Sequence, residues 1–207
     1  MPPRRRKKRR LLRAALVALC LVTLALLAWE ASTWPDVASL ARHNPSTTAF
    51  IDRYRAQQRA AGRDDRVQRT WMPYAAIAPC LKRAVLVAED INFFSHRGFD
   101  VGEIRGAVTK ALEEGEAPRG ASTITQQLAK NLWLSPSRNP LRKLQEAILT
   151  WRLERTLAKR RILELYLNIV EFGPGVYGAE AASRRYFGKS AADLRDDEAA
   201  QLAASLP

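Results

Sequence analysis

Apolar residues recur at helical spacing in several segments of the chain, and no segment alternates apolar and polar residues convincingly as a half-buried strand does. Pro79 is suited to the first position of a helix. The apolar face of that helix runs toward Glu89, and its expected buried residues are Leu81, Ala84, Val85 and Ala88. The pattern therefore predicts a buried helix with an acidic residue at its end.

Later segments repeat this pattern. Asn139 and Pro140 fit the N-cap and first position of a helix that runs to about residue 157, with expected buried residues Leu141, Leu144, Ile148 and Trp151. A second amphipathic stretch is formed by Ile104, Ala107, Val108 and Ala111. Further helices are expected from Lys159 to about Glu171, and from Asp193 onward. The predicted fold class is mainly α.

The most apolar stretch runs from Leu11 to Trp29 and is interrupted only by Arg13 and Thr23. Its length approaches the roughly 20 residues that a helix needs to cross a bilayer. Arg13 and Trp29 lie near its two ends, where such side chains meet the headgroup region. We therefore expect four parts in this chain: a basic tail at 1–10, a transmembrane anchor at 11–29, a connecting segment at 30–70 and a domain at 71–207.

The net charge of +13 is concentrated at the N-terminus, because residues 1–13 hold eight basic side chains and no acidic one. A basic run by itself is typical of a nucleic-acid arm or a solvated tail. Before a membrane anchor it instead predicts a cytoplasmic N-terminus and export of residues 30–207. A cleaved signal peptide is the alternative. We favour an uncleaved anchor, because Ala28-Trp29-Glu30-Ala31 lacks the small residues of a cleavage site.

Cysteine and histidine are too few for the sites that they usually build. Cys20 lies in the predicted anchor and Cys80 in the exported part, so neither a disulfide framework nor a Cys-x-x-Cys zinc site is expected. His43 and His96 do not predict a histidine-based metal site. The GxGxxG pattern at residues 173–178 follows a predicted helix, which argues against dinucleotide binding.

Residues 120–131 predict a helix with an unusually polar face, and Thr123 with Gln126 fits a capping box at its start. One face of this helix carries Thr123, Gln127, Lys130 and Asn131. A solvated surface is one interpretation of that face. Because its groups are amides, a hydroxyl and a single ammonium, binding of sugar hydroxyls and phosphate oxygens is the other.

Arg142, Lys143 and Glu146 also admit two interpretations. Arg142 and Glu146 have the i, i+4 spacing of a surface ion pair, which this segment alone favours. A carboxylate beside two cations can alternatively bind a pyrophosphate together with a metal ion.

Glu89 and Asp90 are adjacent, so on a helix their side chains point apart and one of them is expected to face a reaction. His96 follows in the next turn, and a single histidine is more often structural than catalytic. We expect it to organise the loop behind Glu89.

Five segments together resemble the peptidoglycan glycosyltransferases, enzymes that polymerise lipid-linked disaccharides. The segments are EDINFFSHRGFD (89–100), GASTITQQLAKN (120–131), RKLQEAILTWRLE (142–154), KRRILELYLNIVEFGPGVYGAEAASRRYFGK (159–189) and LRDDEAAQLAASLP (194–207). The chain is most similar to the monofunctional biosynthetic form, since no serine has a lysine three residues on, as a transpeptidase would need.

This resemblance implies a lysozyme-like, two-lobed glycosyltransferase domain at 71–207, behind the anchor. It implies that Glu89 is the general base and that Glu146 is a second catalytic carboxylate, acting at the pyrophosphate or as a metal ligand. The implied substrate-binding residues are Asp90, Phe93, His96, Thr123, Gln127, Lys130, Asn131, Arg142 and Lys143.

The resemblance also implies a divalent cation, Mg²⁺ or Mn²⁺. The implied partners are lipid II, the growing lipid-linked glycan chain, the membrane and other proteins of cell-wall synthesis or division, with no nucleic acid. The implied location is the bacterial inner membrane, with the catalytic domain on the periplasmic side.

Two other functions fit parts of the sequence. A membrane-anchored glycosidase would also use paired carboxylates, with water as the acceptor. The cations beside Glu146 argue against it, because cleavage of a glycosidic bond needs no pyrophosphate site. A catalytically inert scaffold would be expected to lack Glu89 or Glu146, and both are present.

Overall fold

A computed structural model describes residues 13–14, 16–24, 34–115, 122–136 and 139–206. The chain divides into two units, Met1–Asp36 and Val37–Pro207, which are treated separately below.

In the first unit, residues 16–24 are helical and expose apolar side chains such as Leu19 and Leu21. The predicted basic tail at 1–10, and residues 11–12, 15 and 25–29 of the predicted anchor, lie outside the described residues. Within the part that is described, no helix has both the length and the apolar character that crossing a bilayer requires.

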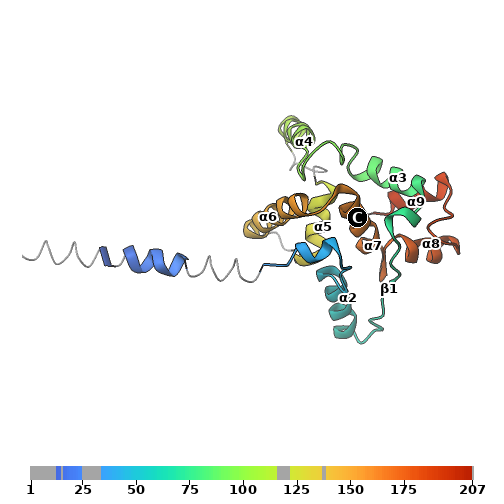
Figure 1. The fold of residues 1–207 in the computed structure, drawn as a ribbon, viewed down its shortest axis with the longest axis horizontal. Helices are drawn as coiled ribbons and strands as arrows, with labels where there is room; N and C mark the ends of the chain where they lie inside the picture. The colour runs from blue at the N-terminus through green and yellow to red at the C-terminus, as the bar shows by residue number, and fades with distance from the viewer. Residues whose placement is uncertain (1–12, 15, 25–33, 116–121, 137–138, 207) are drawn as a thin grey trace, which may run out of the picture. The chain divides into compact units, whose positions relative to one another are not determined.

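The second unit is mainly helical, as the sequence predicts (Figure 1). Its helices are α2 (Ala49–Ala60), α3 (Pro79–Glu89), α4 (Val101–Glu114), α5 (Ile124–Trp133), α6 (Pro140–Thr156), α7 (Lys159–Ile169), α8 (Ala179–Phe187) and α9 (Asp196–Ala204), with short 3₁₀ turns η1 (Ala38–Ala41) and η2 (Tyr74–Ala76). Pro79 and Pro140 occupy first-turn positions, and the side chain of Asn139 accepts a hydrogen bond from the Leu141 N–H. These starts agree with the sequence-based expectations.

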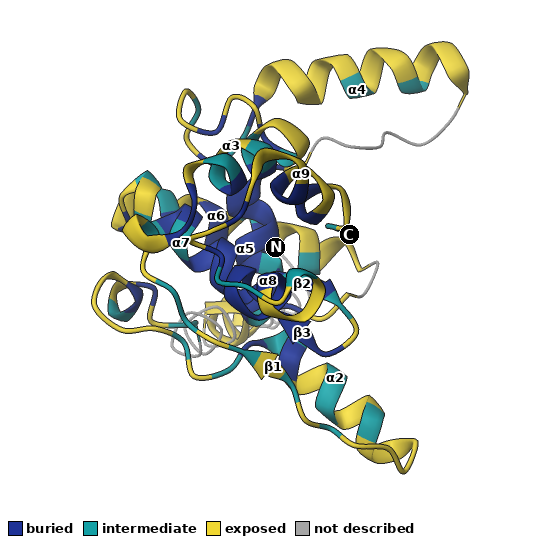
Figure 2. Cartoon of the chain, turned by 90° about the vertical axis from the view of Figure 1, so that its right-hand side faces the viewer, coloured by how far each residue is buried: buried dark blue, intermediate teal, exposed yellow. Residues whose placement is uncertain are grey.

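Helix α5 is the centre of this unit. It packs against α6, α7 and α2, and Figure 2 shows it among the buried elements. Its start is fixed by the predicted capping box, in which Thr123 and Gln126 satisfy each other's backbone N–H groups. Because both its apolar and most of its polar residues are buried, α5 places amide side chains inside the protein rather than on its surface.

Three short strands lie beside the helices in the order β1-β3-β2. Strand β1 (Gln68–Arg69) is parallel to β3 (Val176–Tyr177), and β3 is antiparallel to β2 (Glu171–Gly173). These strands were not predicted from the sequence, because two or three residues are too few to show alternation. The glycine-rich segment that follows α7 is the turn of a β-hairpin rather than a nucleotide-binding loop.

The apolar stripe on α6 is the main departure from the predicted core. Leu141, Leu144, Ile148 and Trp151 were expected to be buried, but their exposed fractions lie between 37% and 68%. The helix instead buries Glu146, Leu149, Thr150 and Leu153. Periodicity shows that a helix has an apolar face, but it does not show which face packs inward.

Helix α4 carries the second amphipathic stretch that the sequence predicts. Ile104 and Val108 are exposed, and no residue of this helix is buried (Figure 2). The apolar stretch that the sequence identified therefore lies on the surface of the second unit.

The second unit begins at Val37, inside the segment 30–70 that the sequence assigned to a connector. Helix α2 from this segment packs on α5 and buries Ile51. Arg161 of α7 donates hydrogen bonds to the Leu40 carbonyl and the Asn44 side chain. A single buried isoleucine among many arginines is a weak sequence signal, which explains why this packing was not predicted.

Candidate active site

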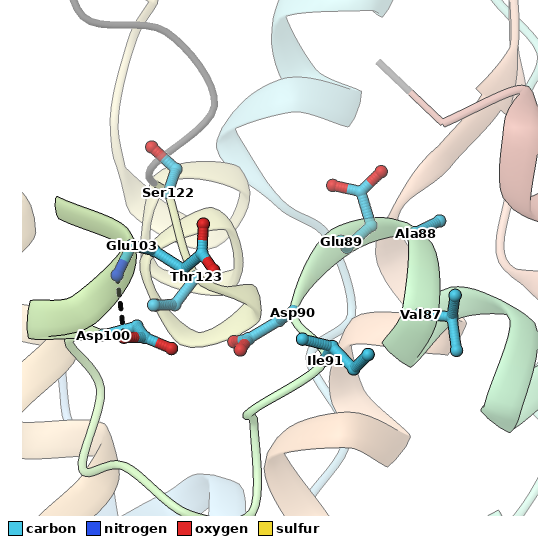
Figure 3. Close-up of a pocket in the computed structure, with 9 residues that line it drawn as sticks. All are labelled: Val87, Ala88, Glu89, Asp90, Ile91, Asp100, Glu103, Ser122 and Thr123. Carbon is cyan, nitrogen blue, oxygen red and sulfur yellow. Dashed lines mark hydrogen bonds between the residues drawn. The ribbon is translucent and has the colours of Figure 1, made fainter. Parts of the chain in front are cut away.

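Glu89 is the last residue of α3, and Asp90 is the residue that caps this helix. The helix ends between them, so their side chains point in different directions (Figure 3). Asp90 is buried, while Glu89 is only partly so. As the sequence suggested, the two carboxylates have different environments.

Asp90 connects three segments through its carboxylate. One oxygen lies 2.8 Å from His96 Nε2, and the other accepts the Ile124 N–H at the start of α5 at 3.0 Å. His96 Nδ1 accepts the Gly98 N–H, so we assign the ring proton to Nε2, which donates to Asp90. The family resemblance implies substrate binding for both residues, and the sequence also led us to expect His96 to organise this loop. Their contacts hold the end of α3 against the start of α5.

Gly98 allows this loop to approach α6 closely. Its φ is +90°, and a Cβ atom there would lie 2.8 Å from Thr150 Cγ2 and 3.0 Å from Glu154 Cγ. The Gly98 carbonyl also accepts a hydrogen bond from the Thr123 hydroxyl at 2.7 Å. The loop that follows Glu89 is thereby fixed to both α5 and α6.

We expect Gly98→Ala to destabilise the protein by about 2–4 kcal/mol, from backbone strain and a steric clash together. Gly62→Ala is the matched control, because Gly62 has a φ of +64° but nothing within 4 Å of its Cβ position. The control should lose about 1 kcal/mol. Denaturant unfolding measures both changes, and equal losses would show that the close approach to α6 contributes nothing.

Gln127 makes the direct contact with Glu89. Its Nε2 donates to Glu89 Oε2 at 2.7 Å, and its Oε1 accepts a hydrogen bond from the buried Tyr166 hydroxyl at 2.9 Å. Gln127 was predicted as a site residue, whereas Tyr166 was not. A tyrosine in an apolar helical pattern gives no sign of a polar role, because such residues are usually core.

Glu146 forms a second charged cluster on α6. Arg142 Nη1 lies 2.7 Å from one Glu146 oxygen, and Lys143 Nζ lies 2.5 Å from the other. Only 4% of the Glu146 side chain is exposed, so this cluster is not the surface ion pair that the spacing alone favoured. A buried carboxylate needs such partners, because an unpaired charge there would be strongly destabilising.

Lys130 lies within electrostatic reach of both Glu89 and the Glu146 cluster. Burial lowers the pKa of its ammonium, as do the charges of Arg142 and Lys143, whereas the carboxylates of Glu146 and Glu89 act in the opposite direction. The ammonium lies 5.9 Å from the centre of the Phe50 ring. Lys130 is therefore a half-buried cation within electrostatic reach of both carboxylates.

Three other predicted binding residues serve mainly to support this arrangement. Phe93 is fully buried, and Lys159 Nζ lies 4.2 Å from the centre of its ring. Thr123 caps α5, and the Asn131 side chain donates to the Gln127 carbonyl at 2.9 Å. These contacts support the site, and their implied substrate binding stays a prediction.

A cavity of about 220 Å³ opens beside Glu89 (Figure 3). Its polar lining includes Glu89, Asp90, Asp100, Glu103, Ser122 and Thr123. The pKa of Asp100 is lowered, chiefly because its carboxylate accepts the Glu103 N–H at the start of α4, and also because Asn92 donates to it. Glu89 thus borders a space that can admit a polar substrate.

A metal site made only of protein groups is not found in the described part of the chain, where no three His, Cys, Asp or Glu side chains gather suitably. Glu146 is a single carboxylate next to cations. Mg²⁺ often binds through one or two carboxylates, with substrate phosphates completing its coordination. The residues present therefore fit an ion that arrives with a phosphorylated substrate.

Comparison with known proteins identifies the family. Residues 55–207 match the sequence pattern of the transglycosylase family. A biosynthetic peptidoglycan transglycosylase of Thiobacillus denitrificans is 50% identical, over 94% of this chain and 81% of the relative. Proteins of the same name from Azoarcus sp. and Alcanivorax borkumensis are each 48% identical, over 94% and 97% of this chain and 83% and 77% of the relatives. The chain belongs to the transglycosylase family, among the biosynthetic peptidoglycan transglycosylases.

Proposed function

We propose that this chain polymerises lipid II into linear peptidoglycan strands and has no transpeptidase activity. The observation that carries the proposal is the arrangement around Lys130. One half-buried ammonium lies within electrostatic reach of Glu89, which borders an open cavity, and of Glu146, which holds two further cations. A base and an anion-binding region side by side suit transfer of a sugar from a pyrophosphate.

In the proposed reaction, Glu89 removes the proton from the sugar 4-hydroxyl of an incoming lipid II. The oxygen attacks C1 of the growing chain, and the bond from C1 to the pyrophosphate oxygen breaks. Undecaprenyl pyrophosphate leaves with the electron pair, and the configuration at C1 is inverted. The hydrogen bond from Gln127 holds the Glu89 carboxylate while this occurs.

The leaving group is already anionic, so it needs neutralisation of its growing charge more than it needs a proton. Lys130, Arg142 and Lys143 are the cations of the site that can provide this. Glu146 holds Arg142 and Lys143 in place through its two oxygens. A divalent cation, Mg²⁺ or Mn²⁺, held by Glu146 and the pyrophosphate, would add positive charge at the same place.

We further propose a single-pass inner-membrane protein, with a cytoplasmic tail at 1–10, an anchor at 11–29 and a lysozyme-like domain on the periplasmic side. The apolar helical residues 16–24 and the basic residues before them support the anchor and its orientation. The exposed apolar residues of α6, Leu141, Leu144, Ile148 and Trp151, support contact of the domain with lipid. Both substrates carry polyprenyl chains, which places the reaction at a membrane surface.

If the α6 stripe contacts lipid, Leu144→Glu should lower polymerisation in proteoliposomes by about tenfold, because a partly buried leucine is worth roughly 1.5 kcal/mol. In detergent micelles, which adapt to the protein, the loss should be less than threefold. Tyr186→Glu is the control, since it alters an exposed apolar residue on α8. Equal losses in both media would indicate damage to the site, and no loss in either would exclude this contact.

The function is tested by supplying the purified full chain with lipid II and Mg²⁺ in detergent, and separately with a soluble glycan. Long glycan polymers from lipid II, and no cleavage of the soluble glycan, are expected. Cleavage of the soluble glycan without use of lipid II would identify a glycosidase. A folded protein that makes no polymer would contradict the proposal.

A further inference from the structure

We propose that Tyr166 is a positioning residue for the base Glu89 and that it acts through the side chain of Gln127. This inference rests on the proposed function, because it assumes that Glu89 receives the acceptor proton. Tyr166 itself lies in α7 and is fully buried.

The three side chains form one continuous chain of hydrogen bonds across three helices. Tyr166 of α7 donates to Gln127 of α5 at 2.9 Å, and Gln127 donates to Glu89 at the end of α3 at 2.7 Å. The Gln127 backbone carbonyl is also held by Asn131. The base is thus connected to the buried centre of the domain by two short hydrogen bonds.

The direction of this chain is fixed by chemistry. An ionised carboxylate can only accept hydrogen bonds, so Glu89 requires the NH₂ group of Gln127. The amide oxygen must then face Tyr166, whose hydroxyl is the donor. Burial, together with the charges of Glu89 and Asp90, holds the pKa of Tyr166 well above its ordinary value, so this donor proton is retained. Glu89 therefore sets the amide orientation, and Tyr166 holds Gln127 in it by donating to the amide oxygen.

This orientation matters because Glu89 has several rotatable bonds and stands at the end of a helix, partly exposed beside the cavity. Gln127 occupies its Oε2 atom, which leaves Oε1 to take the acceptor proton. Without the Tyr166 hydroxyl, the buried Gln127 amide oxygen loses its donor, and the amide can move away from Glu89. The carboxylate would then spend less time in the geometry that proton transfer requires. Substrate binding would change little, because Tyr166 is buried away from the cavity surface.

The first test is Tyr166→Phe, assayed by polymerisation of lipid II with Mg²⁺ in detergent. We expect kcat to fall by about 10- to 100-fold, with KM for lipid II within twofold of wild type. Tyr177→Phe is the matched control, because it removes a hydroxyl from another buried tyrosine. Tyr177 lies in β3 and packs against Tyr54 of α2. The control should keep wild-type kcat. Unchanged kcat in Tyr166→Phe would overturn the proposal.

A double-mutant cycle separates this positioning role from a general loss of packing. If Tyr166 acts through Gln127, the double variant Tyr166→Phe/Gln127→Ala should be no slower than Gln127→Ala alone. Losses that multiply would show that the two residues act independently and would overturn the proposal. If Tyr166→Phe does not fold, Gln127→Met breaks the same chain at its middle residue, and wild-type kcat in that variant would overturn the proposal equally.

Failure of this inference is distinguishable from failure of the proposed function. A wild-type protein that polymerises lipid II, with a Tyr166→Phe variant that matches it, removes only the role of Tyr166. A wild-type protein that makes no polymer removes the proposed function and this inference with it.

Discussion

Glu89→Gln is expected to lower kcat for lipid II polymerisation by about 10³-fold, within the range that general base catalysis usually contributes. The substitution keeps the size of the side chain and can still accept the hydrogen bond from Gln127 through its amide oxygen. It removes the only property that the mechanism requires of this residue, which is the ability to take a proton. KM for lipid II should therefore change little.

Glu113→Gln is a suitable control, because it makes the same change on an exposed part of α4. The melting temperature of each variant should remain within a few degrees of wild type, since neither change alters the core. Polymer formation by Glu89→Gln at the wild-type rate would remove this residue from the mechanism. A loss that accompanies unfolding would instead be a stability effect.

The second large effect is expected at Lys130. Lys130→Met keeps roughly the length of the side chain but removes the charge that lies within electrostatic reach of both carboxylates. We expect kcat to fall by about 10²- to 10³-fold, comparable with the loss of one oxyanion donor in other enzymes. Lys82→Met is the control. Lys82 donates to the Tyr74 carbonyl outside the site, and burial lowers its pKa too. Similar losses in both variants would contradict a special role for Lys130.

Lys130 also predicts the alkaline limit of activity. Because burial lowers its pKa, the ammonium loses its proton at a lower pH than the ordinary lysine value of about 10.4. Polymerisation should therefore decline on the alkaline side before that pH. In Lys130→Arg the guanidinium stays protonated, so its pH–rate profile should extend to higher pH even if its rate at neutral pH is lower. The same alkaline limit in both proteins would assign the decline to another group.

The sequence predicted helices more reliably than it predicted what they pack against. The starts at Pro79, Thr123 and Pro140 follow from local capping chemistry, which a single sequence contains. The orientation of α6 depends on tertiary contacts. Its buried face carries Glu146, whose charge is compensated by Arg142 and Lys143, while its most apolar side chains face outward. Hydrophobic periodicity alone favours the opposite arrangement.

The same distinction applies to the site. The family resemblance pointed to Glu89, Lys130 and Glu146, although the residues around Glu146 alone favoured a surface ion pair. The structure brings both carboxylates within electrostatic reach of Lys130. The sequence alone does not distinguish side chains that contact substrate from those that hold other side chains in place. Asp90 and His96 are engaged with each other. A supporting role for His96 was expected from the sequence, but its partner Asp90 was identified only from the fold.

Analysis of the products formed from lipid II tests the central claim most directly. The purified full chain should form one new glycosidic linkage, inverted at C1, for each undecaprenyl pyrophosphate released. That one-to-one ratio is expected because each attack by a 4-hydroxyl displaces one pyrophosphate. Release of undecaprenyl pyrophosphate without new linkages, or retention of configuration at C1, would contradict the proposed glycosyl transfer at Glu89.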